Sequence, residues 1–147
     1  MTTAGHIHFS WKSYIDFAEE LINGIPQDSE NETVERCGIS RAYYGVFNVV
    51  RNYLKRKNQT IDLNGKGSHE KVIGCVEDFG RTERLFRNIA LELRNLKALR
   101  ISADYNDKFF STLTDRNKIL KKESKLAVLK ARNILKWLDK IEENELA

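Results

Sequence analysis

The sequence is poor in the residues that interrupt regular structure. It contains one proline and eight glycines among 147 residues. Sandwiches and barrels of short strands need frequent turn residues, and no useful run of strand-like alternation occurs in the chain. Charged residues reach 31%. This composition favours long helices over an all-β fold, and the length fits one domain with its own core.

Long hydrophobic runs are also lacking. No apolar run approaches the ~20 residues that a membrane-spanning helix needs. The first residues show no basic region followed by an apolar stretch, which is the pattern of a signal peptide. We therefore expect a cytoplasmic protein that does not enter a membrane.

Cysteine and histidine are too few to predict a metal centre. The two cysteines, Cys37 and Cys75, match no metal-ligand spacing, and in a reducing cytosol they are expected to be small core residues. His6 and His8 have a spacing that could hold a metal, but two ligands alone do not make a site. No phosphate-cradling glycine loop and no Gly-x-Ser-x-Gly motif is present, so no cofactor is expected.

Apolar residues recur at helical spacing throughout the chain. The pattern predicts helices over residues 11–23, 32–57 and 68–79, from about 82 to 100, and over 114–143. Ser10, Ser68 and Thr82 are the expected caps of three of them. Residues 1–147 are expected to form a single all-α, up-and-down bundle of about five helices, with roughly nine mobile residues at the N-terminus.

Two helices carry further information. Gly45, in the middle of the second predicted helix, costs about 1 kcal/mol relative to alanine, so we expect a close helix crossing or a subunit contact there. In the last helix, apolar residues spaced by seven predict lengthwise packing against other helices. They are Leu113, Leu120, Ala127, Ile134 and Ile141.

The net charge is only +4, but the last helix concentrates basic residues between positions 116 and 140. This stripe includes Lys121 and Lys125 and is interrupted by Glu123 and Asp139 alone. It could bind phosphates or an acidic partner, or it could be a solvated helix face.

Arg100 continues the stripe of Phe86 and Leu93 toward the core, where an unpaired guanidinium would be costly. Asp104 is four residues on and could pair with it if the chain turns back, and Tyr105 adds a hydroxyl. Two interpretations stay open. The pair could be a structural lock between the last two helices, or the arginine could be held at a cleft to bind a phosphate oxygen.

Three stretches together resemble the HEPN family of small all-helical domains. They are Ser40-Arg41-Ala42-Tyr43-Tyr44, Gly67-Ser68-His69-Glu70, and Arg100-Ile101-Ser102-Ala103-Asp104-Tyr105. The resemblance rests on their order and spacing, and it spans roughly residues 11–138, which is nearly the whole chain. The resemblance implies a helical bundle that dimerises, packed through the second and fourth helices, in a prokaryotic defence or toxin–antitoxin setting. It also implies that Arg100 and Asp104 anchor a cleft, with Arg41 and Arg94 at its rim.

Many HEPN proteins are metal-independent ribonucleases that carry Arg-x(4–6)-His. Counting on from Arg100 or from Arg94, no histidine falls at those spacings. Histidine moves protons near neutral pH, whereas tyrosine and aspartate side chains, with ordinary pKa values of about 10 and 4, would need large shifts. The leading expectation is therefore a non-catalytic binding protein.

Two alternatives stay open. The first is a ribonuclease that uses Arg100 with Tyr105, Asp104 or an unusual histidine as the proton carrier. His69 is expected to be an exposed helix-start residue, although a dimer could bring it near Arg100 of the other chain. The second is a helical scaffold that pairs with a nucleotidyltransferase-like protein and has no affinity for RNA.

Overall fold

The structure is a computed structural model that describes residues 9–107 and 116–146. These residues form five helices and no strand. In chain order the helices are α1 (Lys12–Asn23), α2 (Glu32–Lys57), α3 (Ser68–Phe79), α4 (Arg84–Tyr105) and α5 (Arg116–Leu146). The predicted all-α bundle of about five helices is confirmed.

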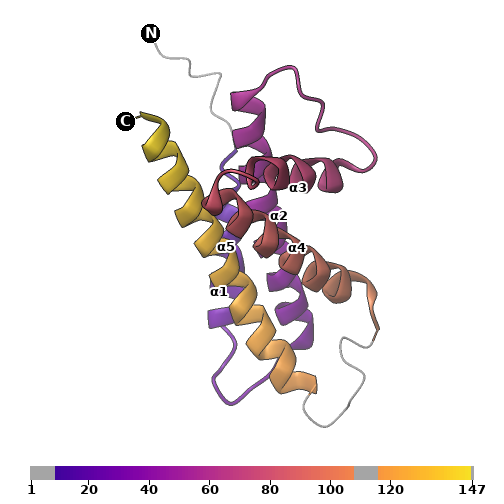
Figure 1. Cartoon of the computed structure of the whole chain (residues 1–147). Helices are drawn as coiled ribbons and strands as arrows, with labels where there is room; N and C mark the ends of the chain where they lie inside the picture. The colour runs from indigo at the N-terminus through magenta and orange to yellow at the C-terminus, as the bar shows by residue number, and fades with distance from the viewer. Residues whose placement is uncertain (1–8, 108–115, 147) are drawn as a thin grey trace.

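The longest helices form the body of the bundle (Figure 1). α2 is central and packs against α1, α4 and α5, while α5 runs lengthwise along α1, α2 and α4. α3 lies across the upper part of the bundle and packs mainly on α4. No described helix combines the length and apolarity needed to cross a membrane.

The core contains the residues that the periodicity selected. Tyr43 and Ile39 of α2 are fully buried, as are Leu120 and Ile134 of α5. The spacing by seven in α5 is confirmed from Leu120 to Ile141, and Leu113 lies outside the described residues. Each helix thus contributes one apolar face to a single core, which supplies most of the stability of such a bundle.

The expected caps were wrong at three helix starts. Trp11, Gly67 and Glu83 occupy the N-cap positions of α1, α3 and α4, and none of them makes a side-chain cap hydrogen bond. Gly67 has a φ of 79°, a left-handed conformation that glycine adopts without strain. Cap preferences are worth only about 1 kcal/mol, so the path of the preceding loop decides the position.

Gly45 lies where α2 crosses α1. A Cβ atom at this position would lie 2.9 Å from Ile15 Cγ1 and 3.0 Å from the carbonyl oxygen of Trp11. The close helix crossing predicted for this glycine is confirmed, because no larger side chain fits between the two helices without displacing one of them.

One carboxyl group is buried without a hydrogen bond of normal geometry to any described residue. Glu35, in the first turns of α2, has no exposed surface, and neither side-chain oxygen makes a hydrogen bond that meets normal geometry. Burial, reinforced by nearby Glu30 and Glu32, raises the pKa of Glu35, while Lys121 and a weak contact with the backbone of Asn31 oppose the shift. Such a group reduces the stability of the fold at any pH at which it is ionised.

Candidate functional site

α4 carries Arg100 into the interior of the bundle, as the stripe through Phe86 and Leu93 predicted. Only 7% of the residue is exposed. Its Nε atom is buried and has no hydrogen-bond partner among the described residues. A guanidinium has five N–H donors, so this arginine retains unused donor capacity in a site with little access to water.

Aromatic rings replace much of the missing hydration. The guanidinium carbon of Arg100 lies 5.5 Å from the ring centre of Tyr43, 5.2 Å from that of Tyr44 and 5.8 Å from that of Tyr105. Contacts of this kind contribute about 0.5–2 kcal/mol each. Three rings therefore stabilise the buried cation while leaving its Nε donor unused.

Asp104 supplies the only carboxylate paired with Arg100 in the described part of the chain. Its Oδ2 lies 3.8 Å from Nη1 of Arg100, and it also accepts a hydrogen bond from the hydroxyl of Ser40 at 3.2 Å. The expected pairing is confirmed, but the expected geometry was wrong. α4 continues to Tyr105, so the two residues lie one helical turn apart and the pair does not close a turn between helices.

Arg36 explains why α4 extends beyond Arg100. Its guanidinium donates to the carbonyl oxygens of Ser102 at 3.3 Å, Ala103 at 2.9 Å and Asn106 at 2.7 Å, and it also reaches that of Asp107. The final carbonyls of a helix have no partner within it, and a cation at this end is favourable. A side chain of α2 therefore holds the end of α4.

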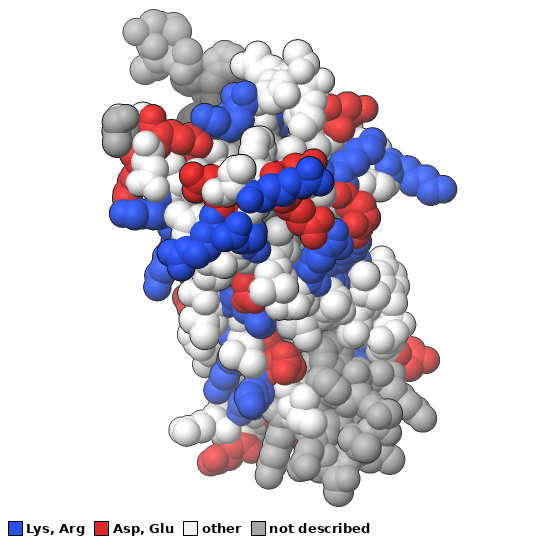
Figure 2. Space-filling model, viewed as in Figure 1, with Lys and Arg blue, Asp and Glu red and all other residues white. Residues whose placement is uncertain are grey.

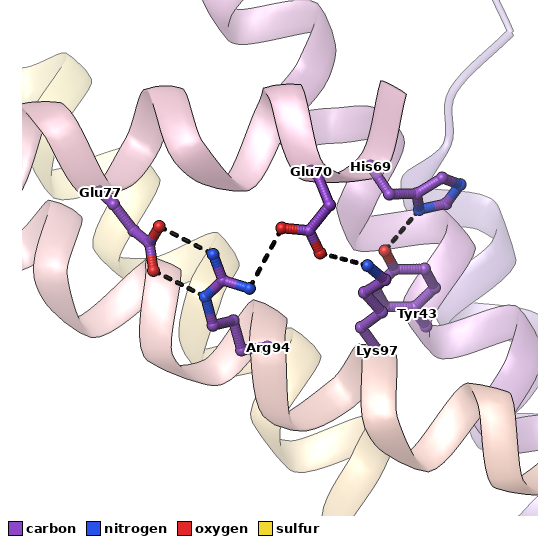
Figure 3. Close-up of polar contacts among 6 residues, drawn as sticks. All are labelled: Tyr43, His69, Glu70, Glu77, Arg94 and Lys97. Carbon is purple, nitrogen blue, oxygen red and sulfur yellow. Dashed lines mark hydrogen bonds and ion pairs between the residues drawn. The ribbon is translucent and has the colours of Figure 1, made fainter. Parts of the chain in front are cut away.

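His69, in the first turn of α3, contacts the same tyrosine as Arg100. The hydroxyl of Tyr43 lies 2.6 Å from His69 Nδ1, and the imidazole stacks on Phe47 with ring centres 4.2 Å apart. Figure 3 shows Tyr43 pointing at this nitrogen and the other ring nitrogen pointing away. We call Arg100, Tyr43, Tyr44, His69 and Asp104 the Arg100 cluster.

The expectation that His69 is exposed was wrong, because its ring is half-buried against α2. Burial, reinforced by the positive charges of Arg100 and Lys97, lowers the pKa of His69, and Glu70 opposes the shift. Burial also raises the pKa of Tyr43. At neutral pH the tyrosine therefore keeps its proton and the imidazole is neutral, and which of the two groups donates depends on which ring nitrogen carries the imidazole proton.

Arg94 lies outside the Arg100 cluster. Its guanidinium forms hydrogen bonds to both carboxylate oxygens of Glu77, at 2.6 and 2.8 Å, and to Glu70 at 3.3 Å (Figure 3). Lys97 pairs with the other oxygen of Glu70. These cations lower the pKa of Glu70 and Glu77. The arginine that the resemblance placed at a rim thus joins α4 to α3.

Arg41 also lies away from the cluster. Its guanidinium carbon is 5.5 Å from the ring centre of Tyr14 in α1. It is half-buried on the side of α2 that faces α1, whereas Tyr43 and Tyr44 contact Arg100 on α4. The structure therefore brings together Arg100, Asp104 and Tyr105, and separates Arg41 and Arg94 from them.

Internal contacts use several basic residues of α5. Lys121 donates to the carbonyl oxygens of Gln27 and Ser29, each at 2.8 Å, in the loop before α2. Lys130 pairs with Glu92, and Arg132 pairs with Asp16 and Glu19. Lys125 lines a shallow hollow beside the same loop. On the face drawn in Figure 2, acidic and basic side chains are interspersed.

Metal-binding groups do not gather in the described residues, where no cluster of three or more histidine, cysteine, aspartate or glutamate side chains could hold an ion. His6 and His8 lie outside this part of the chain, as do the N-terminal residues expected to be mobile. Cys37 and Cys75 are free and half-buried.

The contact between Tyr43 and His69 and the cap supplied by Arg36 were not found from the sequence. Both contacts join residues that are far apart in the sequence: Tyr43 and His69 are separated by 26 positions, and Arg36 is separated by 66–71 positions from the residues that it caps. A weak indication of the contact between Tyr43 and His69 was present in the sequence, because both residues lie in stretches that carry the HEPN resemblance. Arg36 lies in none of the sequence motifs described above, so no pattern indicated its role.

Comparisons of the chain with protein-family models, with curated proteins and with solved structures give no match. Chemically, the Arg100 cluster can bind an anion. It combines a buried cation that has an unused donor, a neutral imidazole, and aromatic rings on which a base can stack.

Proposed function

We propose that the protein is a HEPN-like, non-catalytic RNA-binding and dimerisation protein of a prokaryotic defence or toxin–antitoxin system. One observation carries this proposal. The three stretches on which the resemblance rests are separated in the sequence by about 25 to 60 residues, and they meet at the Arg100 cluster. Ser40, Tyr43 and Tyr44 come from the first stretch, His69 from the second, and Arg100 and Asp104 from the third.

The unused donor of Arg100 supports a phosphate ligand. The planar guanidinium matches two phosphate oxygens, and a site with little water strengthens such a bond. Tyr105 lies at the last position of α4 and covers the guanidinium, yet 72% of this tyrosine is exposed. Rotation of one exposed side chain therefore opens the site, and the tyrosine ring can stack on the base next to the bound phosphate.

The state of His69 favours binding over cleavage. We assign the hydroxyl of Tyr43 as the donor to Nδ1, so the nitrogen that could accept a proton as a general base is already bonded. The lowered pKa keeps the imidazole neutral, and a neutral imidazole is a weak acid. Such a histidine can donate a hydrogen bond to a phosphate oxygen without transferring a proton.

An exposed stripe on α4 supports the dimer. Leu91 is 62% exposed, and Tyr105, fourteen positions on, lies on the same face because it is separated from Leu91 by a multiple of seven. Ala98 lies midway between them and is also exposed. A second copy that packs on this stripe covers apolar surface and closes over the Arg100 cluster at the end of the helix.

The ribonuclease alternative is favoured by one specific observation. His69 and Arg100 both contact Tyr43 within a single chain, so no second copy is needed to bring them together. The charge of a bound phosphate would raise the pKa of His69 and make it a better proton carrier. Binding and cleavage must therefore be measured in the same experiment.

The test uses a fluorescein-labelled single-stranded RNA of about 20 nucleotides in EDTA, with anisotropy as the binding readout and a denaturing gel as the cleavage readout. Arg100→Lys keeps the charge and removes the planar fork. We expect roughly tenfold weaker binding, equivalent to about 1.4 kcal/mol, and no cleavage by either protein. Arg81→Lys makes the same exchange at an exposed position in the loop between α3 and α4, and is the control.

Thermal unfolding followed by circular dichroism checks that both variants fold. Equal losses in the two variants would mean that binding does not depend on the guanidinium of Arg100 in particular, and the proposed site would be rejected. Cleavage by the wild-type protein that both Arg100→Lys and His69→Gln abolish would make the protein a ribonuclease instead.

A further inference from the structure

A hollow of about 530 Å³ lies on the other side of α2, between the start of α1 and the last turns of α5. Its floor is apolar. Leu138 is 2% exposed and Leu135 9% exposed, and the partly buried Val49 of α2 completes the floor. The volume falls within the usual range of ligand pockets, and it is large enough for a few side chains of a partner.

One lip of the hollow is aromatic. Phe9, Trp11 and Tyr14 pack edge to face, with ring centres 4.9 to 5.6 Å apart. Phe9 and Trp11 line the hollow, and Phe9 is 58% exposed. Exposed aromatic residues beside an apolar floor are typical of the surfaces that proteins use for recognition.

The opposite lip is acidic. Asp139, Glu142 and Glu143 of α5 line it, at spacings that place them on one face of the helix. Arg56 pairs with Glu142 at 3.7 Å, and both side chains are largely exposed. Asp139 and Glu143 form no ion pair with any described residue. Lys12 and Arg56 also line the hollow, so its carboxylates outnumber its cations by one, on a protein whose net charge is +4.

We propose that this hollow, which we call the Trp11 groove (Trp11, Val49, Leu135, Asp139 and Glu143), binds a cationic amphipathic segment of a partner protein. Apolar side chains of the segment pack on Leu135 and Val49, while its lysines or arginines pair with Asp139 and Glu143. The proposal does not rest on RNA binding by the Arg100 cluster, which involves the α3 and α4 side of α2.

Charge complementarity selects this occupant. Two unpaired carboxylates disfavour a nucleic acid or an acidic peptide. They also give specificity, because the net positive charge of the protein repels cationic chains elsewhere on its surface. An apolar floor with a polar rim matches the arrangement in which amphipathic helices bind grooves.

The test uses fluorescein-labelled peptides of about 14 residues and measures anisotropy. The probe is a leucine–lysine peptide with leucines on one helical face. One control peptide replaces lysine by glutamate, and a second replaces leucine by serine. We expect the first peptide alone to bind, with a Kd in the range of about 10–100 μM, and to bind less tightly as salt is added.

The protein variant Asp139→Lys/Glu143→Lys should weaken this binding at least tenfold. Glu20→Lys/Asp28→Lys changes the net charge equally at exposed positions outside the groove, and should change the Kd less than twofold. Asp139→Asn/Glu143→Gln keeps the side-chain size, so it replaces the charge reversal if that variant does not fold.

Three results would overturn the proposal. The first is equal binding by the wild-type and charge-reversed proteins. The second is equal binding of the lysine and glutamate peptides. The third is a wild-type dimer, seen by light scattering, that becomes monomeric in the charge-reversed variant, because a second copy would then occupy the groove.

Discussion

Replacing Glu35 with glutamine should stabilise the protein at neutral pH. The wild-type carboxyl has no exposed surface and no hydrogen bond of normal geometry to a described residue, so ionising it in the folded state is unfavourable. An unsatisfied buried polar group costs about 1–3 kcal/mol. Glutamine keeps an unpaired amide but removes the charge, so we expect a gain of about 1–2 kcal/mol at pH 7, or roughly 3–6 °C in Tm.

The gain in stability from Glu35→Gln should increase as the pH rises. The pKa of Glu35 is raised in the folded state above its ordinary value of 4.5, so folding favours the protonated form. The stability that this form provides is complete below pH 4.5 and is lost as the pH rises through the folded-state pKa. The advantage of Glu35→Gln should therefore be largest at pH 7 and vanish near pH 4.

Urea unfolding followed by circular dichroism, at pH values between 4 and 8, measures this difference. Glu20→Gln, at an exposed position of α1, is the matched control and should change little. A glutamine variant that is less stable than the wild type at pH 7, or a difference that is the same at pH 4 and pH 7, would refute the reasoning. Either result would mean that the carboxylate has a favourable partner in solution.

Two further predictions concern helix packing and the imidazole. Gly45→Ala should lower stability by about 1–3 kcal/mol in thermal melts because its Cβ has no room at the helix crossing, whereas Gly74→Ala, with open space around it, should be neutral or stabilising by up to about 1 kcal/mol. In an NMR titration, Arg100→Gln should raise the pKa of His69 and Glu70→Gln should lower it, because the two charges act in opposite directions. Shifts of the same sign in both variants would contradict the assigned causes.

The sequence predicted the helices well because each one buries a regular apolar face. α2 begins and ends at the expected residues, α3 ends at the expected Phe79, and the positions spaced by seven in α5 are buried from Leu120 onward. The helix starts were predicted less well, since weak cap preferences compete with the path of the loop.

The candidate site was only partly predictable. Periodicity placed Arg100 in the core and beside Asp104. It did not reveal that Tyr43 joins His69 to Arg100, since this arrangement depends on how α3 crosses the bundle. Nor could it show that Arg94 is occupied by two glutamates from α3. Contacts between distant segments depend on the tertiary fold, and periodicity within a helix does not encode them.

The cap that Arg36 places on α4 has a consequence for local fluctuations. The last turn of a helix normally frays far more readily than the whole protein unfolds, and its amide hydrogens exchange early. Here the carbonyls of that turn are bonded to a side chain of the central helix, more than sixty residues away in the chain. Asp104 and Tyr105 can leave Arg100 by fraying only when those bonds open. The exchange protection of this turn is therefore set by α2, and loss of the Arg36 side chain would loosen Arg100's surroundings without altering any residue that contacts it.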